Sequence, residues 1–300
     1  MTTASISWRS RRADVTPFWP LYIEPLLGAL KPERILQVGA GDGELSARLV
    51  AHGLASGAAL EIVDPRPPKD LEEGLGATVQ RVQPWKPAAL TRHADLVLLD
   101  GEPNWWAVFT ILGALRRLAA ESGAAFPVVL AHHAAWPYAR RDMYPTPELV
   151  QEAHPYAYLG VDPDRPQLVQ DGIGARFAHA VREGGVRNGV LTALEDFAAS
   201  ATVDLQLWTF PLLGGLAILA PPSRVTPELR TMIEGFSSPE ASARAVDAAS
   251  AEARRLAARL AEAEARLDRR TAALERAREL IARQEADLAA LRQQLKGKPA

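Results

Sequence analysis

Two adjacent histidines are the residues of this chain best suited to acid–base chemistry. His132 and His133 directly follow the apolar run 127–131. Imidazole titrates near neutral pH, so either ring could take a proton from a reacting group. The segment after them adds aromatic rings and guanidinium groups that could hold an anionic or sugar-bearing acceptor. These side chains are Trp136, Tyr138, Arg140, Arg141 and Tyr144. The alternative is a segment whose aromatic rings pack beneath it and whose arginines face water.

A glycine-rich turn points to a ligand. The stretch 35–45 reads Ile-Leu-Gln-Val-Gly-Ala-Gly-Asp-Gly-Glu-Leu. Gly39, Gly41 and Gly43 allow a sharp turn and leave no side chain between backbone and ligand. A dinucleotide-binding turn would have a glycine where this chain has Glu44. The acidic residues between and after the glycines favour a zwitterionic or cationic ligand over a pyrophosphate.

A carboxylate at the end of the next apolar run adds to this ligand site. Asp64 follows the run 59–63 and lies about twenty residues beyond the glycines, where a carboxylate can accept hydrogen bonds from both ribose hydroxyls. Together, the turn and the carboxylate predict a cofactor that contains a nucleoside. Trp85 could border its adenine ring, or could be plain core.

The elements that must position these groups follow an alternating strand and helix pattern. Short runs that are apolar on both faces predict buried parallel strands covered by helices, and hence an open doubly wound α/β sheet. The strands are expected at 34–38, 59–63, 77–82, 95–99 and 127–131, with an antiparallel pair at 203–210 and 214–220. Helices are expected at 17–30, 43–52, 104–120 and 187–199. The segment 132–186 lacks this regularity, which predicts a lid or substrate-binding insertion.

Composition limits the class of protein. The chain has 300 residues, 48% of them hydrophobic, a net charge of -2 and no cysteine. This predicts a globular cytoplasmic protein with no nucleic-acid partner, no disulfides and no membrane association. A small-molecule acceptor is the expected partner.

The motifs resemble those of class I S-adenosylmethionine-dependent methyltransferases. The resemblance rests on Gly39-Ala-Gly-Asp-Gly43, on Asp64 and on Asp95-Leu-Val-Leu-Leu-Asp-Gly101. It implies a Rossmann-like seven-stranded sheet with an antiparallel last strand and S-adenosylmethionine as cofactor. The implied cofactor-binding residues are Gly39, Ala40, Gly41 and Gly43 for the methionine moiety, Asp64 for the ribose, and Asp100 and Gly101.

A closer resemblance, over residues 17–221, is to bacterial methyltransferases associated with sugar and natural-product tailoring. It rests on three strings: Asp100-Gly-Glu-Pro-Asn-Trp-Trp106, His132-His-Ala-Ala-Trp-Pro-Tyr-Ala-Arg-Arg-Asp-Met-Tyr144 and Gly185-Val-Arg-Asn-Gly-Val-Leu-Thr-Ala-Leu-Glu-Asp-Phe197. In that family the first string reads Asp-Gly-Asp-His-Asn-Trp and the second begins His-Asp. This chain instead has Glu102, Pro103 and His133, and Gln37 stands where the glycine motif usually carries an acid.

Some of these relatives hold a divalent metal ion after the fourth and fifth strands. The corresponding residues here are Asp100, Glu102, His132 and His133. Magnesium prefers oxygen ligands, so two histidines disfavour this ion or shift preference toward a transition metal. The other possibility is a site that works without metal, with His132, His133 and Asp100 as its catalytic residues.

The C-terminal part has the pattern of a coiled coil. Apolar residues recur every seven residues, at Leu260, Leu267, Leu274, Ile281, Leu288 and Leu295. The companion column, which includes Arg270 and Gln284, is poorer. We expect homo-oligomerisation through this helix, and the alternative is a single solvated helix.

The sequence therefore predicts an N-terminal helical segment at 1–33, a methyltransferase domain at 34–221 with its insertion at 132–186, and a linker with a coiled-coil helix at 222–300. The predicted function is O-methylation of a small-molecule or sugar-containing acceptor. The alternative is a catalytically degenerate methyltransferase fold that serves as a binding or scaffold module, assembled through its coiled coil.

Overall fold

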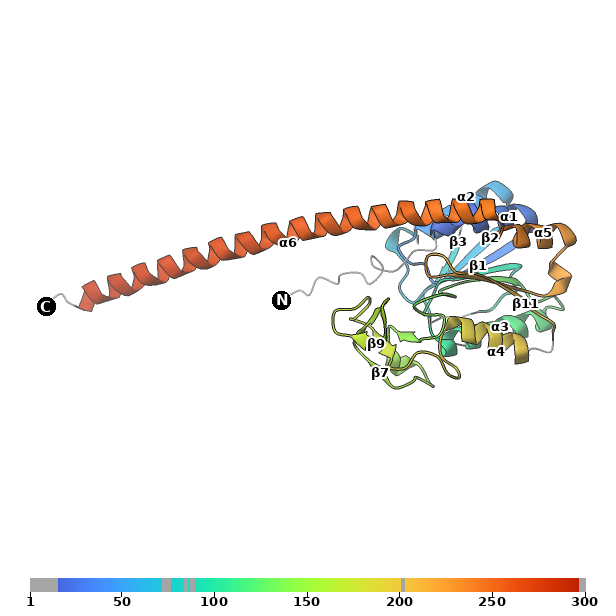
Figure 1. Ribbon diagram of the computed structural model, residues 1–300, viewed down its shortest axis with the longest axis horizontal. Coiled ribbons are helices and arrows are strands. Elements are labelled where there is room, and N and C mark those ends of the chain that lie inside the picture. Colours follow the sequence, from blue (N-terminus) through green and yellow to red (C-terminus); the bar gives the residue numbers. More distant parts are fainter. Residues whose placement is uncertain (1–15, 72–76, 84–85, 87–89, 201–202, 297–300) are drawn as a thin grey trace. The chain divides into compact units, whose positions relative to one another are not determined.

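The structure, a computed structural model, describes residues 16–71, 77–83, 86, 90–200 and 203–296 (Figure 1). The chain divides into two compact units, Met1–Val246 and Asp247–Ala300. Trp85 and residues 1–15 of the expected N-terminal segment lie outside the described residues.

A seven-stranded sheet forms the centre of the first unit, in the order β11-β12-β5-β4-β1-β2-β3. The strands are β1 (Arg34–Val38), β2 (Ala59–Val63), β3 (Ala77–Gln80), β4 (Leu96–Leu99), β5 (Val128–His132), β11 (Gln206–Phe210) and β12 (Leu216–Ala220). Strands β1 to β5 pair in parallel, and β12 runs antiparallel to both β5 and β11. This confirms the doubly wound Rossmann-like sheet with an antiparallel last strand.

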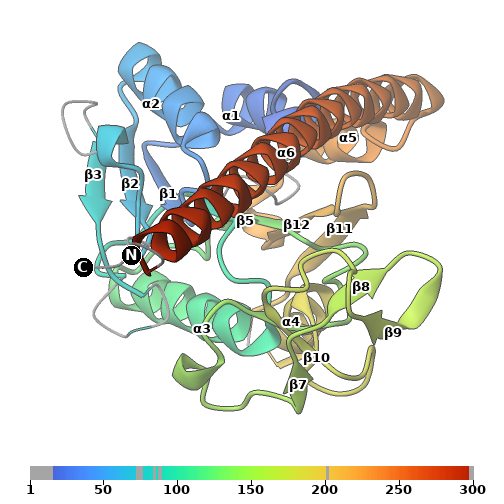
Figure 2. The ribbon, with the colours of Figure 1, turned by 90° about the vertical axis from the view of Figure 1, so that its left-hand side faces the viewer.

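Helices cover both faces of the sheet because the strands are apolar on both faces. Helices α1 (Glu24–Leu30), α2 (Glu44–Ser56) and α5 (Pro227–Gly235) lie on one face, and α3 (Trp105–Glu121) and α4 (Val190–Ser200) lie on the other (Figures 1 and 2). Neighbouring residues of β1 point to opposite layers: Ile35 belongs to the core under α1 and α2, while Leu36 belongs to the core above α3 and α4.

The N-terminal segment departs from the single helix expected at 17–30. It consists of a 3₁₀ turn (Thr16–Phe18), a π-helical turn (Trp19–Ile23) and α1. Pro20 and Pro25 each lie at the start of a new turn. Because proline has no N–H to donate, each one interrupts the hydrogen-bond ladder that a continuous helix would need.

The insertion 132–186 contains more regular structure than its sequence indicated. Strands β6 (Met143–Tyr144), β10 (Ala178–Ala180) and β7 (Tyr156–Ala157) form a small antiparallel sheet, and β8 (Gly160–Asp162) pairs with β9 (Arg165–Val169). A 3₁₀ turn covers Pro147–Leu149. These strands are too short for the periodicity of their side chains to be recognised in the sequence.

The C-terminal helix α6 (Pro239–Lys296) is continuous over 58 residues. Its first two turns belong to the first unit, where Ala241 and Ala245 are buried. In the second unit the apolar heptad residues are exposed, for example Leu267 at 64% and Leu288 at 52%. The helix is confirmed, and its pairing as a coiled coil stays a prediction. Within the described part of the chain, no helix has the length and apolar character needed to cross a membrane.

Candidate active site

The main predicted site residues come together at one edge of the sheet. Strands β1, β4 and β5 are parallel neighbours, so their carboxyl ends lie side by side. Gly39 follows β1, Asp100 follows β4, and His132 is the last residue of β5. Open α/β sheets bind their ligands at this edge.

Gly39 is required by the packing of the backbone. It has a φ of +89°, and a Cβ placed on it would lie 2.3 Å from the main-chain oxygen of Asp100. The loops after β1 and β4 could not approach so closely around any other residue. The sequence did not indicate this packing requirement, and a contact between Gly39 and a ligand stays a prediction.

Gly41 and Gln37 are better placed to receive a ligand. Apart from its two chain neighbours, no described residue has an atom within 4 Å of a Cβ built on Gly41, whose φ is +54°. Gln37 is fully buried, and its amide nitrogen donates to the carbonyl of Gly39 at 2.9 Å. Its Oε1 is buried with no donor among the residues that the structure describes. An unsatisfied buried acceptor costs stability and fits a ligand that brings a donor.

Asp64 holds the glycine turn against the end of β2. Its carboxylate accepts the N–H of Ala40 at 2.8 Å and the N–H of Arg66 at 2.6 Å, and the residue is 2% exposed. This bracing of the turn is a role that the sequence did not indicate. A contact between Asp64 and a ribose stays a prediction.

Asp100, His132 and His133 form a compact cluster. One oxygen of Asp100, Oδ1, lies 2.7 Å from His132 Nδ1 and 3.7 Å from His133 Nε2. The two imidazole rings stack with centroids 4.0 Å apart, and both residues are almost fully buried. Glu102 does not belong to this group of three, and its carboxylate accepts a hydrogen bond from the side-chain amide of Asn104 at 3.5 Å.

The turn between β11 and β12 fixes the position of His132. Its Nε2 lies 3.2 Å from the carbonyl oxygen of Leu213, so both ring nitrogens face oxygen acceptors. Leu213 has a left-handed backbone with a φ of +52°. The same turn accepts the N–H of Ala135 at the carbonyl of Gly214, at 2.9 Å. These contacts attach the segment after β5 to the antiparallel strand pair.

Tyr138 extends the cluster into the insertion. Its ring lies edge-on to the ring of His133, and its hydroxyl lies 3.4 Å from Nε2 of His179. The other nitrogen of His179, Nδ1, lies 2.7 Å from the carbonyl of Leu159 and therefore carries the proton. The hydroxyl of Tyr138 accordingly donates to His179. The sequence contained no signal for His179, because it lies far along the chain in an unrecognised strand.

Three of the five residues predicted to bind substrate have structural partners instead. Arg141 is 2% exposed and donates to the carbonyls of Pro166, Ala180 and Val181. Arg140 forms a two-pronged ion pair with Glu195. Tyr144 is fully buried, and burial raises the pKa of its hydroxyl.

These three side chains hold the insertion together, and we leave them out of the proposed site. Trp136, at 42% exposed, and Tyr138 stay candidates for substrate contact.

Asp142 joins the three strings on which the closer resemblance rests. Its Oδ1 accepts the N–H groups of Trp105 and Gly189, each at 2.7 Å, and its Oδ2 accepts the hydroxyl of Tyr144 at 2.8 Å. The N–H of Asp142 donates to the side chain of Asn188 at 2.7 Å. One carboxylate thus serves the first turns of α3 and α4, where negative charge is favourable.

Two opposing effects act on the pKa of Asp142. Burial raises the pKa of Asp142, and the hydrogen bonds from Gly189, Trp105 and Tyr144 oppose that rise. The three unusual strings therefore meet at Asp142, which is a structural hub of the first unit.

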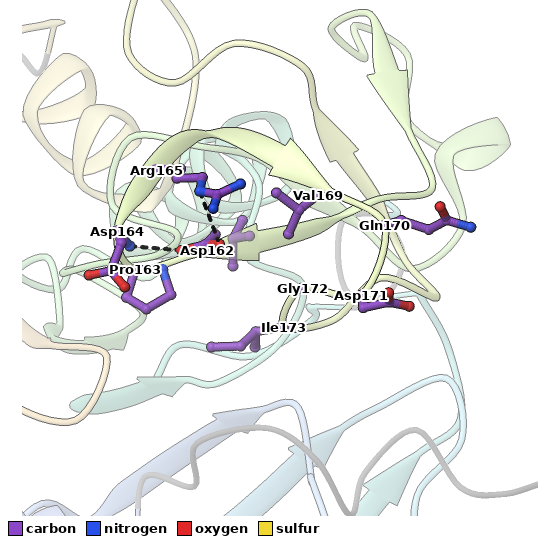
Figure 3. A pocket seen from close by; sticks show the side chains of 10 residues that line it. Asp162, Pro163, Asp164, Arg165, Val169, Gln170, Asp171, Gly172 and Ile173 are labelled. Atoms are coloured by element: carbon purple, nitrogen blue, oxygen red, sulfur yellow. Dashed lines mark hydrogen bonds and ion pairs between the residues drawn. The ribbon is translucent and has the colours of Figure 1, made fainter.

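A pocket of about 430 Å³ lies on the β8–β9 hairpin and the turn that follows it (Figure 3). Asp162, Asp164 and Asp171 contribute carboxylates to its lining. Asp162 accepts the N–H of Asp164 and lies 3.9 Å from the side chain of Arg165. None of the predicted site residues lines this pocket, which therefore belongs to the insertion alone.

Comparison with known proteins returns distant structural likenesses. No protein-family model matches the chain, and no curated protein matches it. Among solved structures, a methyltransferase from Podospora anserina bound to SAH matches with a TM-score of 0.40 and 12% identity, covering 69% of this chain and 78% of that one. An O-methyltransferase from Bacillus cereus in complex with SAH matches with a TM-score of 0.39 and 10% identity, covering 70% and 83%.

An N-methyltransferase from Bradyrhizobium japonicum in complex with S-adenosyl-L-homocysteine matches with a TM-score of 0.40 and 11% identity, covering 73% of this chain and 94% of that one. All three are methyltransferases crystallised with S-adenosyl-L-homocysteine. The fold assignment itself rests on the strand order of this chain's own sheet.

Proposed function

We propose that the chain is a methyltransferase that uses S-adenosylmethionine to methylate an oxygen atom of a small-molecule or sugar-containing acceptor. Two observations carry the proposal together: the space in front of Gly41 and the buried acceptor Gln37 Oε1. Gln37 lies near the end of β1 and Gly41 in the glycine turn that follows, at the edge of the sheet that also holds Asp100 and the histidine pair.

The proposed cofactor suits these groups. Its methionine part ends in an ammonium group, which donates hydrogen bonds, and Gln37 Oε1 is an acceptor that lacks a donor among the described residues. Asp64 has one backbone N–H on each carboxylate oxygen. Asp64 directly follows β2, next to the glycine turn after β1, which is where a carboxylate that binds a ribose is expected.

Methyl transfer needs the acceptor to be aligned with the methyl group and to lose a proton. We assign proton removal to His133, because both ring nitrogens of His132 face Asp100 and Leu213. The carboxylate of Asp100, 3.7 Å from His133 Nε2, would stabilise the imidazolium that forms. His132 then serves as a positioning residue, and Trp136 and Tyr138 contact the acceptor.

Calorimetry with S-adenosylmethionine tests this proposal. We expect the full chain to bind the cofactor. Gln37→Met keeps the side-chain volume but removes the acceptor, together with the donor to the Gly39 carbonyl. This variant should bind the cofactor at least about tenfold more weakly, the equivalent of one hydrogen bond to a charged group. Thermal melting of both proteins controls for folding. Absence of heat with the unsubstituted chain would reject both the cofactor and the enzyme.

The second candidate function is a binding or scaffold module that keeps the fold without turnover. The burial of both histidines, 2% for His132 and 3% for His133, favours this alternative. Cofactor binding without methyl transfer to any hydroxyl-bearing acceptor in a screen would support it over the enzyme.

We also propose that α6 pairs with α6 of a second copy as a coiled coil. In the described part of the helix, Leu260, Leu267, Leu274, Ile281 and Leu288 are each more than half exposed. Burying a leucine side chain contributes roughly 1.5–3 kcal/mol, so a stripe of this length favours a partner over water.

The double substitution Leu267→Glu with Leu274→Glu is expected to shift the mass measured by light scattering toward the monomer. A matched control, Ala258→Glu with Ala286→Glu, adds the same charge to the opposite face of the helix and should leave the mass unchanged. Equal masses for all three proteins would contradict pairing through this stripe. Truncation should begin at Asp247, because Ala241 and Ala245 are buried in the first unit.

A further inference from the structure

The surface of α6 that we propose for pairing carries two columns of side chains of unequal size. The leucine column is large and apolar, and each of these members is more than half exposed: Leu260, Leu267, Leu274, Ile281 and Leu288. A companion column of small or polar residues follows it at a spacing of three residues, and these side chains are exposed as well: Ala263, Arg270, Ala277 and Gln284. Together the columns form the seven-residue repeat of a coiled coil, so both must meet the partner helix.

The direction of the partner helix decides which side chains meet. In a parallel pair in register, each residue faces the same residue of the second copy, so each column packs against itself. In an antiparallel pair the columns are exchanged, and each member of the leucine column faces the companion column of the other helix. Knobs enter holes in both directions, so the identities of the facing side chains must choose between them.

Parallel pairing suits the companion column poorly. Ala263 and Ala277 would each face their own copy, and two methyl groups cannot fill a layer whose width is set by the leucine layers on either side. Arg270 would face Arg270 of the second copy within one layer, where like charges repel. The parallel pair therefore combines cavities with charge repulsion.

Antiparallel pairing places a large side chain opposite a small or polar one. A leucine that faces an alanine gives a layer of even volume, which is how a core is filled without voids. Arg270 then faces an apolar residue, against which its aliphatic stem packs while its guanidinium reaches water, and the arginines of the two copies lie in different layers. We propose that α6 binds α6 of a second copy in the antiparallel direction. This rests on the pairing proposed above, and not on cofactor binding or methyl transfer.

The direction of pairing determines where the two first units are attached. Helix α6 leaves the first unit at its N-terminal end, where Ala241 and Ala245 are buried. Antiparallel helices therefore carry their first units at opposite ends of the paired segment. The stripe from Leu260 to Leu288 alone has a length of about 42 Å at a rise of about 1.5 Å per residue. We therefore expect each candidate active site to be built from a single copy.

Distances between spin labels test the direction in the full chain. The chain has no cysteine, so a single introduced cysteine accepts one label. Ala258→Cys and Ala286→Cys place labels at exposed positions opposite the leucine column. In an antiparallel pair of any register, the axial separations of the labels in the two variants add up to at least about 84 Å, twice the length from 258 to 286. Pulsed electron paramagnetic resonance should therefore give about 42 Å or more in at least one variant. A parallel pair in register would give about 20–25 Å in both, the width of two helices.

The controls separate the direction of pairing from pairing itself. Light scattering should give a mass of two copies for both labelled chains, and adding Leu267→Glu with Leu274→Glu should abolish the measured distance. Two copies with short distances in both variants would overturn the antiparallel direction and leave the pairing intact. A mass of one copy would overturn the pairing and this inference together, and a distance that persists in the glutamate variants would show that the copies meet elsewhere. Calorimetry with S-adenosylmethionine tests the methyltransferase proposal independently of all these outcomes.

Discussion

Replacing Asp142 by alanine is expected to lower the free energy of unfolding by about 3–5 kcal/mol. The carboxylate accepts hydrogen bonds from the N–H groups of Trp105 and Gly189 and from the hydroxyl of Tyr144. All of these donors except that of Trp105 come from the insertion or from the residues that follow it. Alanine would leave three donors in a region closed to water, where Asp142 itself is 1% exposed. Urea unfolding measures the difference.

Asp142→Asn is the matched control for this substitution. Both N–H groups point to Oδ1, which asparagine retains, and only the contact with Tyr144 changes from acceptor to donor. We expect a loss of about 1–2 kcal/mol. If the alanine variant lost no more stability than the asparagine variant, the hub would not be the structural centre described above.

Two glycines of the same turn are expected to respond in opposite ways. Gly39→Ala should cost about 3 kcal/mol or more of folding free energy, because its Cβ would lie 2.3 Å from the carbonyl oxygen of Asp100 and its φ is +89°. Gly41→Asn should cost little, since asparagine tolerates the left-handed region and the part of the chain that the structure describes places no atom within 4 Å of the added Cβ, chain neighbours aside. Thermal melting compares the two variants.

For cofactor binding, we expect the substitution at Gly41 to have the larger effect. Asparagine at position 41 extends into the space assigned to the methionine part of S-adenosylmethionine, so calorimetry should show at least about a tenfold loss of affinity, about 1.4 kcal/mol. Unchanged affinity in Gly41→Asn would place the cofactor elsewhere. A fully stable Gly39→Ala would show that the loops after β1 and β4 can separate without cost.

Local sequence patterns were sufficient to predict the main helices and strands of the fold. The strands from β1 to β5 are short apolar runs bounded by turn residues, and the structure confirms all of them within a few residues. The N-terminal segment is the exception, because Pro20 and Pro25 divide a helical pattern that hydrophobic spacing alone presents as continuous. The short strands of the insertion were missed, since two or three residues carry no measurable period.

The site was predictable only in part. The order of parallel strands brings the ends of β1, β4 and β5 together, so the proximity of Gly39, Asp100 and His132 follows from the fold class. The roles of the two arginines did not follow from it. Arg141 and Arg140 have the chemistry of anion-binding residues, yet their partners lie 25 to 55 residues away along the chain.

What the sequence determined by itself was therefore the α/β fold, the glycine turn, the long helix and the edge of the sheet where chemistry is expected, because each depends on residues close together in the chain. Only the tertiary structure decided which polar groups already have hydrogen-bond partners within the protein. Leu213 meets His132 across 81 positions and Asp142 meets Gly189 across 47. Hydrogen-bond partners that far apart leave no periodic trace in the sequence, since they depend on how separate loops pack.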